Sequence, residues 1–281
     1  MRICSFMGKS KDKMQKNSRQ ITLKGCKNTR DLGGVVTMDG KTVAPCKIFR
    51  SGALRKLSKR SAKKFKRDCQ IDTLLDLRTF GEREHHPVSK HLGDVNLVHI
   101  PIIKNALIGI TADNVSGLKK MQALFNSGMS EQEYMYQTYM EIVSDPEAQL
   151  GFYKMFRVLL EKEDGASVYF CSHGRDRTGI ATLLIYTALG VDEQTILDDY
   201  MIDPSKETKR MLTLINVLEK VRFIDKTQAD FSRDFASPSL KRILPVIEWI
   251  KQNYGSVKEY LHKAIGLTQA DVDQLRQKYL I

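Results

Sequence analysis

The chain has 281 residues, 42% of them hydrophobic, and a formal net charge of +12. This length and composition suffice for one globular domain with a full core, and the charge favours anionic partners such as phosphorylated proteins, acidic lipid headgroups or nucleic acid. Five cysteines without paired spacing argue against a disulfide framework or a zinc site and favour a reducing compartment. No apolar run reaches the roughly 18 residues of a membrane span and no signal peptide is recognised, so we expect a soluble, cytoplasmic protein.

The first predicted elements follow a basic N-terminus. Residues 1–20 carry six cations against one acid, which predicts a flexible tail, followed by a single domain over residues 21–281. Runs of β-forming residues predict strands over 21–23 and 47–51, and a hairpin over 35–43 with Asp-Gly at its turn.

The densest cationic run of the sequence lies at residues 55–67, mostly in a helix for which Ser58 is the predicted N-cap. The run contains no acid, and its cations are Arg55, Lys56, Lys59, Arg60, Lys63, Lys64, Lys66 and Arg67. Such a face is either simply solvated or makes peripheral contact with an anionic membrane, where each cation contributes about 1 kcal/mol. The run lacks the interleaved aromatic residues of nucleic-acid binders, so we expect no specific nucleic-acid partner.

Two further strands are predicted, a buried central strand at residues 71–77 and another strand at residues 96–101. The second should have the first and residues 168–170 as parallel neighbours, because helical crossovers separate the three segments. A polar loop containing His85 and His86 is predicted between the strands at 71–77 and 96–101. Adjacent histidines cannot face one metal ion from a regular element, so we expect no metal site there.

The remainder of the chain is predicted to be mainly helical. Helical patterns cover residues 104–162, a segment beginning at Asp192, residues 205–230, and two or three helices over residues 240–280. Ser130 starts a capping-box sequence within the first of these segments.

The stretch over residues 168–191 has the pattern of a strand, a tight loop and a buried helix. A loop that ends at a helix N-terminus directs several backbone N–H groups inward, and the helix dipole adds partial positive charge. The segment between Cys171 and Arg177 is therefore predicted to cradle a phosphate. The same amides would stabilise a Cys171 thiolate as a nucleophile, while Arg177 would bind two phosphate oxygens.

The surrounding residues make this pattern more specific. Among the five cysteines only Cys171 has an arginine six positions later, at Arg177. Gly174 and Gly179 permit the turn and close helix packing, and Thr178 places a hydroxyl near the thiolate. A buried structural cysteine would explain neither these glycines nor Arg177. A nucleotide-binding loop would require a Gly-Lys-Ser/Thr ending, which is missing.

These residues resemble the cysteine-dependent protein tyrosine phosphatase superfamily, and more narrowly its atypical microbial branch, whose loop usually reads His-Cys-x-x-Gly-Lys-Asp-Arg-Thr-Gly. The resemblance covers residues 28–281 and includes the motifs Asn28-Thr-Arg-Asp-Leu-Gly-Gly34, Arg50-Ser-Gly52, Asp76-Leu-Arg78, Asp199-Tyr200, Tyr254-Gly-Ser-Val257 and Tyr260-Leu261. It implies an α/β fold with a central, mainly parallel sheet, flanking helices and extra helical elaborations. It also implies hydrolysis of phosphomonoesters through a phosphocysteine, without a cofactor, in phosphotyrosine proteins, phosphoinositides or both.

The resemblance assigns roles residue by residue. It makes Cys171 the nucleophile and Arg177 the phosphate clamp, with Thr178 assisting departure of the thiolate. The phosphate-binding residues would be Ser172, His173, Gly174, Arg175, Asp176 and Arg177. In this branch the general acid is associated with the aspartate inside the loop, here Asp176. An aspartate between two arginines tends to stay ionised, which suits a base better, so Asp31, Asp76 and Asp113 remain alternatives.

Two departures from the family pattern bear on activity. Phe170 occupies the position of a histidine that usually helps to hold the thiolate. It motivates an alternative function, a weakly active or inactive module that binds phosphate in the same cradle. His173 replaces a small residue, and Arg175 replaces the usual lysine. These two side chains either contact extra phosphates of a phosphoinositide or point to solvent.

Overall fold

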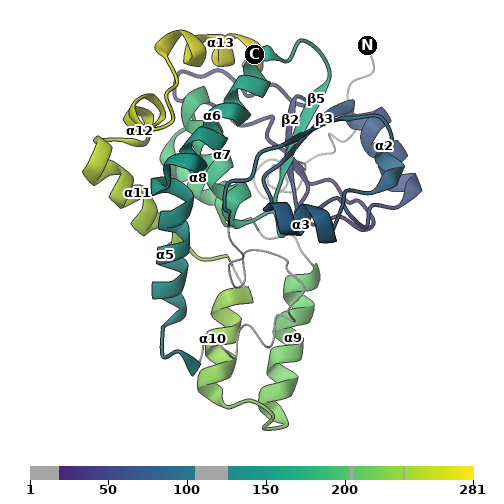
Figure 1. Ribbon diagram of the computed structural model, residues 1–281, viewed down its shortest axis with the longest axis vertical. Coiled ribbons are helices and arrows are strands. Elements are labelled where there is room, and N and C mark those ends of the chain that lie inside the picture. The colour runs from purple at the N-terminus through teal and green to yellow at the C-terminus, as the bar shows by residue number, and fades with distance from the viewer. Residues whose placement is uncertain (1–18, 105–125, 203–205, 237) are drawn as a thin grey trace.

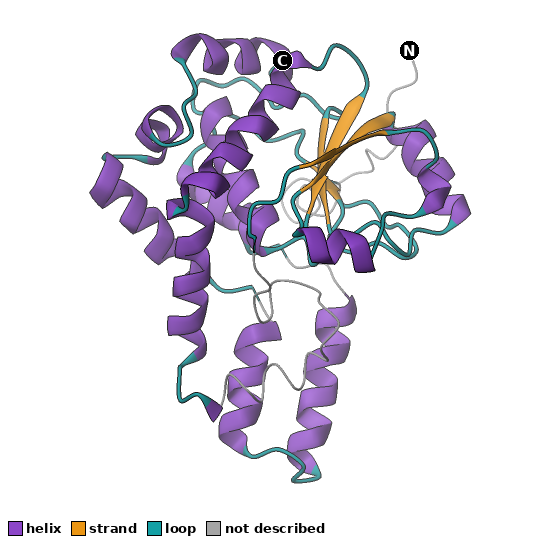
Figure 2. Ribbon diagram, in the orientation of Figure 1, coloured by secondary structure: helices purple, strands orange, loops and turns teal. Residues whose placement is uncertain are grey.

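The computed structural model describes residues 19–104, 126–202, 206–236 and 238–281. A five-stranded sheet with the spatial order β1-β2-β5-β3-β4 lies at its centre (Figures 1 and 2). The strands are β1 Arg30–Asp31, β2 Ile48–Ser51, β3 Ile71–Asp76, β4 Asn96–His99 and β5 Ala166–Phe170. Neighbouring strands are parallel except for the antiparallel pair β1 and β2. The predicted α/β fold with a mainly parallel sheet is confirmed.

Helices cover both faces of the sheet (Figure 1). One face packs against α2, and the other packs against α7 and the helices around it. The helices are α2 Lys59–Cys69, α3 Phe80–His85, the 3₁₀ turn η1 Lys90–Leu92, α5 Glu131–Ser144, α6 Pro146–Glu161, α7 Asp176–Leu189, α8 Glu193–Tyr200, α9 Lys206–Lys220, α10 Lys226–Ala236, α11 Leu240–Tyr254, α12 Val257–Lys263 and α13 Gln269–Tyr279.

The side chains of β5 alternate between these two layers, as the pleat of a strand requires. Val168 and Phe170 join the apolar cluster that includes Phe65 of α2. Tyr169 and the following Cys171 join the cluster on the α7 side. Every residue of β5 is buried, so this strand occupies the centre of the sheet.

The predicted pairing of residues 168–170 with the strand at 96–101 is wrong. β4 pairs with β3, whereas β5 lies on the opposite side of β3 and also pairs with β2. The burial patterns explain this order. β4 is exposed at its first residue and only half-buried afterwards, as expected of an edge strand, while β5 is buried throughout.

Several helix ends fall where sequence signals predict them. Ser58 caps α2, and Ser130 forms a capping box with Glu133 ahead of α5. Pro146 lies in the first turn of α6, where its missing N–H has no cost. Gly190 ends α7 with a φ of 85°, a conformation that glycine adopts without strain.

Other local predictions differ from the structure. Residues 21–23 form no strand. The hairpin predicted over 35–43 is present in short form: Val36 and Thr42 make an antiparallel bridge, and the Val43 and Thr37 N–H groups donate to the Val35 and Lys41 carbonyls at 2.8 Å. The helical stretch predicted over 205–230 consists of two helices, α9 and α10. Arg222 has a φ of 57° between them, and this left-handed residue ends α9 and reverses the chain.

The polar loop predicted after Arg78 is instead the helix α3. Its N-terminus is a capping box: the Glu82 N–H donates to Thr79 Oγ1 at 3.1 Å, and the Thr79 N–H donates to Glu82 Oε2 at 2.9 Å. His85 is the last residue of the helix and His86 its C-cap. The box gives a short, polar sequence enough local order to form a helix.

Two further expectations concern membrane-spanning helices and the N-terminal tail. Among the described residues, no helix is both long enough and apolar enough to cross a lipid bilayer. Residues 1–18 of the predicted tail lie outside the described residues. Arg19, near the end of that tail, forms an ion pair with Asp199 at 3.0 Å. The division into a tail and one domain stays a prediction.

Candidate active site

The 171–177 loop joins the central strand β5 to α7. It lies at the carboxyl end of the sheet, where open α/β folds bind their ligands. The helix that it enters is almost entirely buried, so its N-terminal dipole acts on the loop with little screening by solvent. Topology and helix direction together give this loop the arrangement that is typical of anion-binding sites.

Cys171 lies at the base of the loop, with 1% of its surface exposed. The Gly174 N–H donates to Cys171 Sγ at 3.3 Å, so a backbone amide is directed at the sulfur. Gly174 has a φ of 68°, and a Cβ there would lie 2.7 Å from the Ser51 carbonyl carbon. Glycine is therefore required for this turn to pack against β2.

Arg177 is fully buried and held by Glu82 of α3. Its Nη1 lies 2.7 Å from Glu82 Oε2, and its Nη2 lies 3.1 Å from Glu82 Oε1. Arg177 Nη1 also donates to the Leu77 carbonyl at 3.3 Å, and the Ser172 hydroxyl donates to Glu82 Oε1. This bidentate contact between Arg177 and Glu82 fixes the plane of the guanidinium group beside the loop.

The charges of this pair stabilise one another. Burial acts to raise the pKa of Glu82, but the charge of Arg177 and the hydrogen bonds from Arg177, Ser172 and Thr79 lower it to about 2. Burial opposes the charged form of Arg177, yet Glu82 and Cys171 raise its pKa above the ordinary value. Both side chains are therefore ionised at neutral pH.

Two side chains anchor the loop from behind. Asn28 Nδ2 and Arg50 Nη2 each donate to the Gly174 carbonyl at 2.9 Å. Because the peptide group is planar and trans, fixing this carbonyl turns the Arg175 N–H to the opposite side. Asn28 and Arg50 therefore set the orientation of one of the amides that the loop offers to an anion.

A buried ionic cluster supports these anchors. Asp199 of α8 lies 2.8 Å from Arg30, 3.2 Å from Arg50 and 3.0 Å from Arg19. Burial acts to raise the pKa of Asp199, but the charges of Arg30 and Arg50 hold it well below the ordinary value. Arg30 also donates to Asn28 Oδ1 at 3.1 Å. Motifs distant in sequence thus meet beneath the loop and hold it in place.

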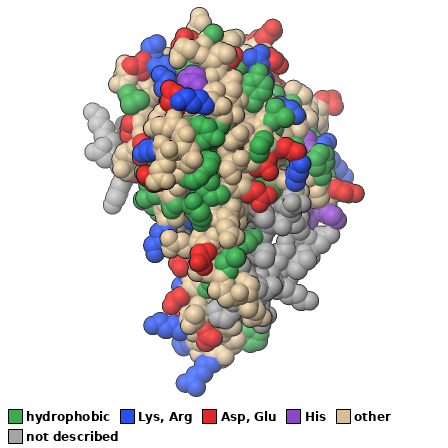
Figure 3. Space-filling view, turned by 60° about the vertical axis from the view of Figure 1, so that its left-hand side comes forward, with side chains coloured by type: hydrophobic (Ala, Val, Ile, Leu, Met, Phe, Trp, Pro, Cys, Tyr) green, Lys and Arg blue, Asp and Glu red, His purple; other side chains and the backbone are tan. Residues whose placement is uncertain are grey.

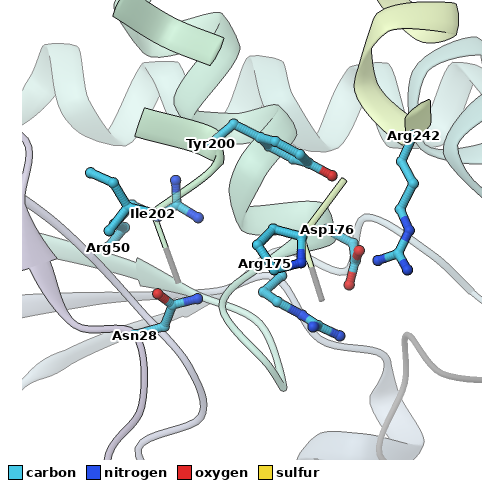
Figure 4. Close-up of a pocket in the computed structure, with 8 residues that line it drawn as sticks. Asn28, Arg50, Arg175, Asp176, Tyr200, Ile202 and Arg242 are labelled. Carbon is cyan, nitrogen blue, oxygen red and sulfur yellow. The ribbon is translucent and has the colours of Figure 1, made fainter. Parts of the chain in front are cut away.

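Asp176 begins α7 and faces away from solvent, with 2% of its surface exposed. Tyr139 donates to Asp176 Oδ1 at 2.8 Å, and its hydroxyl lies 2.6 Å from that of Tyr200. Figure 4 shows the Asp176 carboxylate facing the guanidinium of Arg242 beside a small cavity. Burial acts to raise the pKa of Asp176, but Arg175, Arg242 and the Tyr139 hydrogen bond lower it. The carboxyl group is therefore ionised at neutral pH.

Comparison of the sequence with known proteins identifies the family of the chain. A sequence model described as "Tyrosine phosphatase family" matches residues 21–281. The chain belongs to the tyrosine phosphatase family. A provisionally named tyrosine-protein phosphatase of Cupriavidus necator is 26% identical over 259 residues, which cover 90% of this chain and 85% of the relative. The "triple specificity protein phosphatase PtpB" of Mycobacterium tuberculosis is 25% identical over 277 residues, covering 90% of this chain and 96% of the relative.

Family membership confirms the resemblance and makes the chain a phosphatase. The sequence did not reveal two groups that position its loop. Glu82 was missed because its segment was predicted to be a loop, although the spacing of Thr79 and Glu82 is a capping-box signal. Asn28 and Arg50 were noted only as members of motifs. Their shared contact with Gly174 appears only in the folded phosphatase.

The alternative acids of the phosphatase have other partners. Asp31 accepts hydrogen bonds from the Gly33 and Cys46 amides at 2.8 and 2.7 Å. Asp76 accepts three hydrogen bonds from Arg78, two from its guanidinium at 2.8 and 2.7 Å and one from its backbone N–H at 3.1 Å. Asp113 lies outside the described residues. The carboxylates of Asp31 and Asp76 are thus engaged in hydrogen bonds to backbone amides and to a neighbouring arginine, respectively.

Phe170, the unusual residue before Cys171, points to the α2 side of the sheet of the phosphatase. It is fully buried there, and the guanidinium of Arg78 lies 5.2 Å from its ring centroid. Cys171 belongs to the opposite layer. Phe170 therefore contributes packing and a cation–π contact rather than a hydrogen bond to the sulfur.

The other predicted loop residues of the phosphatase differ in charge and hydrogen bonding. Burial, followed by the charge of Arg175, lowers the pKa of His173 to about 4, so its ring is neutral at neutral pH. His173 is therefore not the cation that a second phosphate would need. Thr178 is fully buried, and within the described part of the chain its hydroxyl has no hydrogen-bond partner. That hydroxyl is available for a group bound in the loop.

Proposed function

We propose that this phosphatase hydrolyses phosphotyrosine proteins and phosphoinositides through a phosphocysteine formed on Cys171. One observation carries the proposal: a buried cysteine receives a loop amide at 3.3 Å, in the loop whose Arg177 is held by Glu82. A phosphate dianion would be bound by the amides of Ser172 to Arg177 and by the Arg177 guanidinium.

The proposed reaction has two steps. The Cys171 thiolate attacks phosphorus, the phosphorus–oxygen bond of the ester breaks, and the leaving oxygen takes a proton from Asp176. Because Asp176 is ionised in the free phosphatase, the bound dianion must first raise its pKa so that the carboxylate takes up a proton from solvent. In the second step Asp176 takes a proton from water, which attacks the phosphocysteine. The Thr178 hydroxyl donates a hydrogen bond to the departing thiolate.

Arg175 is the residue proposed to select substrates with more than one phosphate. It lies in the loop, is partly exposed and is charged, whereas the ring of His173 is neutral. The name of the mycobacterial relative gives that protein a triple specificity, which supports testing substrates beyond phosphotyrosine.

Hydrolysis of an aryl phosphate by the wild type and by Cys171→Ser tests the chemistry. We expect turnover by the wild type and none by the variant. No turnover by the wild type, together with retained binding of inorganic phosphate, would support the phosphate-binding alternative.

A panel of phosphoinositides and phosphotyrosyl peptides then tests the substrate class. Arg175→Ala should lose more activity on phosphoinositides than on peptides. Wild-type activity confined to the peptides would remove the phosphoinositide part of the proposal.

A further inference from the structure

The helices α9 and α10 form a hairpin that projects from the body of the molecule, on the side where α3 lies (Figure 1). The hairpin has a small core of its own, in which Ile215 and Ala229 are buried and Leu212 and Ile224 are partly buried. These four residues hold the two helices together. Other apolar side chains of α9 lie outside this core.

A stripe of apolar side chains on α9 and the following turn is exposed. The exposed fractions are 42% for Met211, 51% for Leu214, 50% for Val217, 64% for Val221 and 75% for Phe223. The spacing of the first four, at intervals of three and four residues, places them on one face of the helix. A continuous exposed apolar surface of this kind marks an interaction site.

Cations surround the exposed end of this stripe. Lys220, Arg222 and Lys226 are exposed around Val221 and Phe223. Considering only the residues that the structure describes, none of the three forms an ion pair with an acidic side chain. Figure 3 shows basic side chains at the lower end of the molecule, where Figure 1 places the turn between α9 and α10.

The acids near this turn are already engaged within the hairpin. Arg233 forms ion pairs with Glu219 and with Asp230. Asp225 accepts the Gln228 N–H at 2.8 Å at the start of α10. Over residues 220–226 three cations stand against the single acid Asp225, so the net charge of the hairpin end is positive.

The backbone of the turn presents Val221 and Phe223, the two most exposed residues of the apolar stripe. The Phe223 N–H donates to the Leu218 carbonyl at 2.9 Å, which closes the end of α9. Arg222 adopts its left-handed conformation between Val221 and Phe223. The result is a convex tip in which Val221 and Phe223 are flanked along the chain by Lys220, Arg222 and Lys226.

We infer that this tip, residues 220–226, docks on an anionic lipid bilayer. Val221 and Phe223 would enter the interfacial region, while Lys220, Arg222 and Lys226 would meet acidic headgroups. A convex tip with three cations and one acid, Asp225, has a net positive charge that complements an anionic, deformable surface. The inference concerns binding alone and holds whichever phosphate ester the phosphatase hydrolyses.

The basic run at residues 55–67 offers a different kind of surface. Its helix α2 has exposed cations, but its apolar residues Ala62, Phe65 and Cys69 are buried in the core. This face can attract an anionic membrane only electrostatically, without inserting apolar side chains. Stable interfacial binding needs both contributions, and the hairpin tip provides them together.

Co-sedimentation of the full chain with vesicles tests the inference. Wild type should bind vesicles of phosphatidylcholine mixed with phosphatidylserine, and bind pure phosphatidylcholine weakly. The double variant V221S/F223S should lose about tenfold or more in affinity for the acidic vesicles. Lys220→Glu with Arg222→Glu should cause a comparable loss and a weaker dependence on salt.

Leu150→Ser is the matched control, because Leu150 is an apolar residue of α6 with 49% exposure, outside the hairpin. It should bind like the wild type. Unchanged hydrolysis of a soluble aryl phosphate by the tip variants would show that they are folded. Failure of the wild type to bind acidic vesicles, or binding by the tip variants at wild-type affinity, would overturn the inference. Loss of binding only in Lys63→Glu with Lys64→Glu would assign the membrane face to α2 instead.

Discussion

Replacing Glu82 by glutamine tests how Arg177 is positioned. Glu82 uses both carboxylate oxygens, accepting from Arg177 twice, from Ser172 and from the Thr79 amide. Glutamine has one acceptor oxygen, so half of these contacts are lost and an NH₂ group faces donors. Two lost hydrogen bonds to charged groups, at about 1.5–3 kcal/mol each, predict a decrease of about 3–6 kcal/mol in the free energy of unfolding.

The same substitution should lower activity. Without the second carboxylate oxygen the Arg177 guanidinium keeps its contact with the Leu77 carbonyl but loses the bidentate contact that fixes its plane. A misplacement of about 1 Å reduces a rate by about 100-fold. Urea unfolding measures the stability, and hydrolysis of an aryl phosphate gives kcat/KM. Ser172→Ala is the comparison, because it removes one hydrogen bond to Glu82 and leaves both contacts with Arg177. It should lower the free energy of unfolding by about 1.5–3 kcal/mol, the range for one hydrogen bond to a charged group, against two in Glu82→Gln. Wild-type values of both quantities in Glu82→Gln would refute the positioning role.

Three other predictions follow from the site. Asn28→Ala removes one donor to Gly174 and should weaken orthovanadate binding about tenfold; an unchanged Kd would show that the anchor is dispensable. Asp176→Asn should lower kcat about 100-fold and let the phosphocysteine accumulate during turnover, whereas a wild-type kcat would exclude Asp176 as the proton acceptor. Folding lowers the pKa of Glu82 from 4.5 to about 2. The stability that the ionised Glu82 contributes to the folded state is therefore fully present above pH 4.5 and is lost as the pH falls toward 2. Urea unfolding should show that the free energy of unfolding falls by about 3 kcal/mol across this pH range in the wild type and by much less in Glu82→Gln. The same pH dependence of this free energy in both proteins would contradict the prediction.

Features that depend on neighbouring residues could be predicted from the sequence. The order of strand, loop and helix around Cys171 follows from a short apolar run, two glycines and a long buried pattern. The caps at Ser58 and Ser130 depend on residues within one helical turn, and both are confirmed. These signals are local, so the folded context does not alter them.

Features that depend on distant residues could not be predicted in the same way. Arg177 and Glu82 are 95 positions apart, and nothing in either segment specifies the other. The position of β5 between β2 and β3 likewise depends on which buried surfaces match. The convergence of Asn28, Arg50 and Asp199 beneath Gly174 required the sheet order to be known first.

Acid quenching of the phosphatase during turnover of a radiolabelled phosphate ester tests the central claim most directly. We predict that the wild type retains label in a covalent bond to Cys171, located by peptide mapping, and that Cys171→Ser retains none. Turnover by the wild type without labelled Cys171, or label retained by Cys171→Ser, would contradict the proposed phosphocysteine.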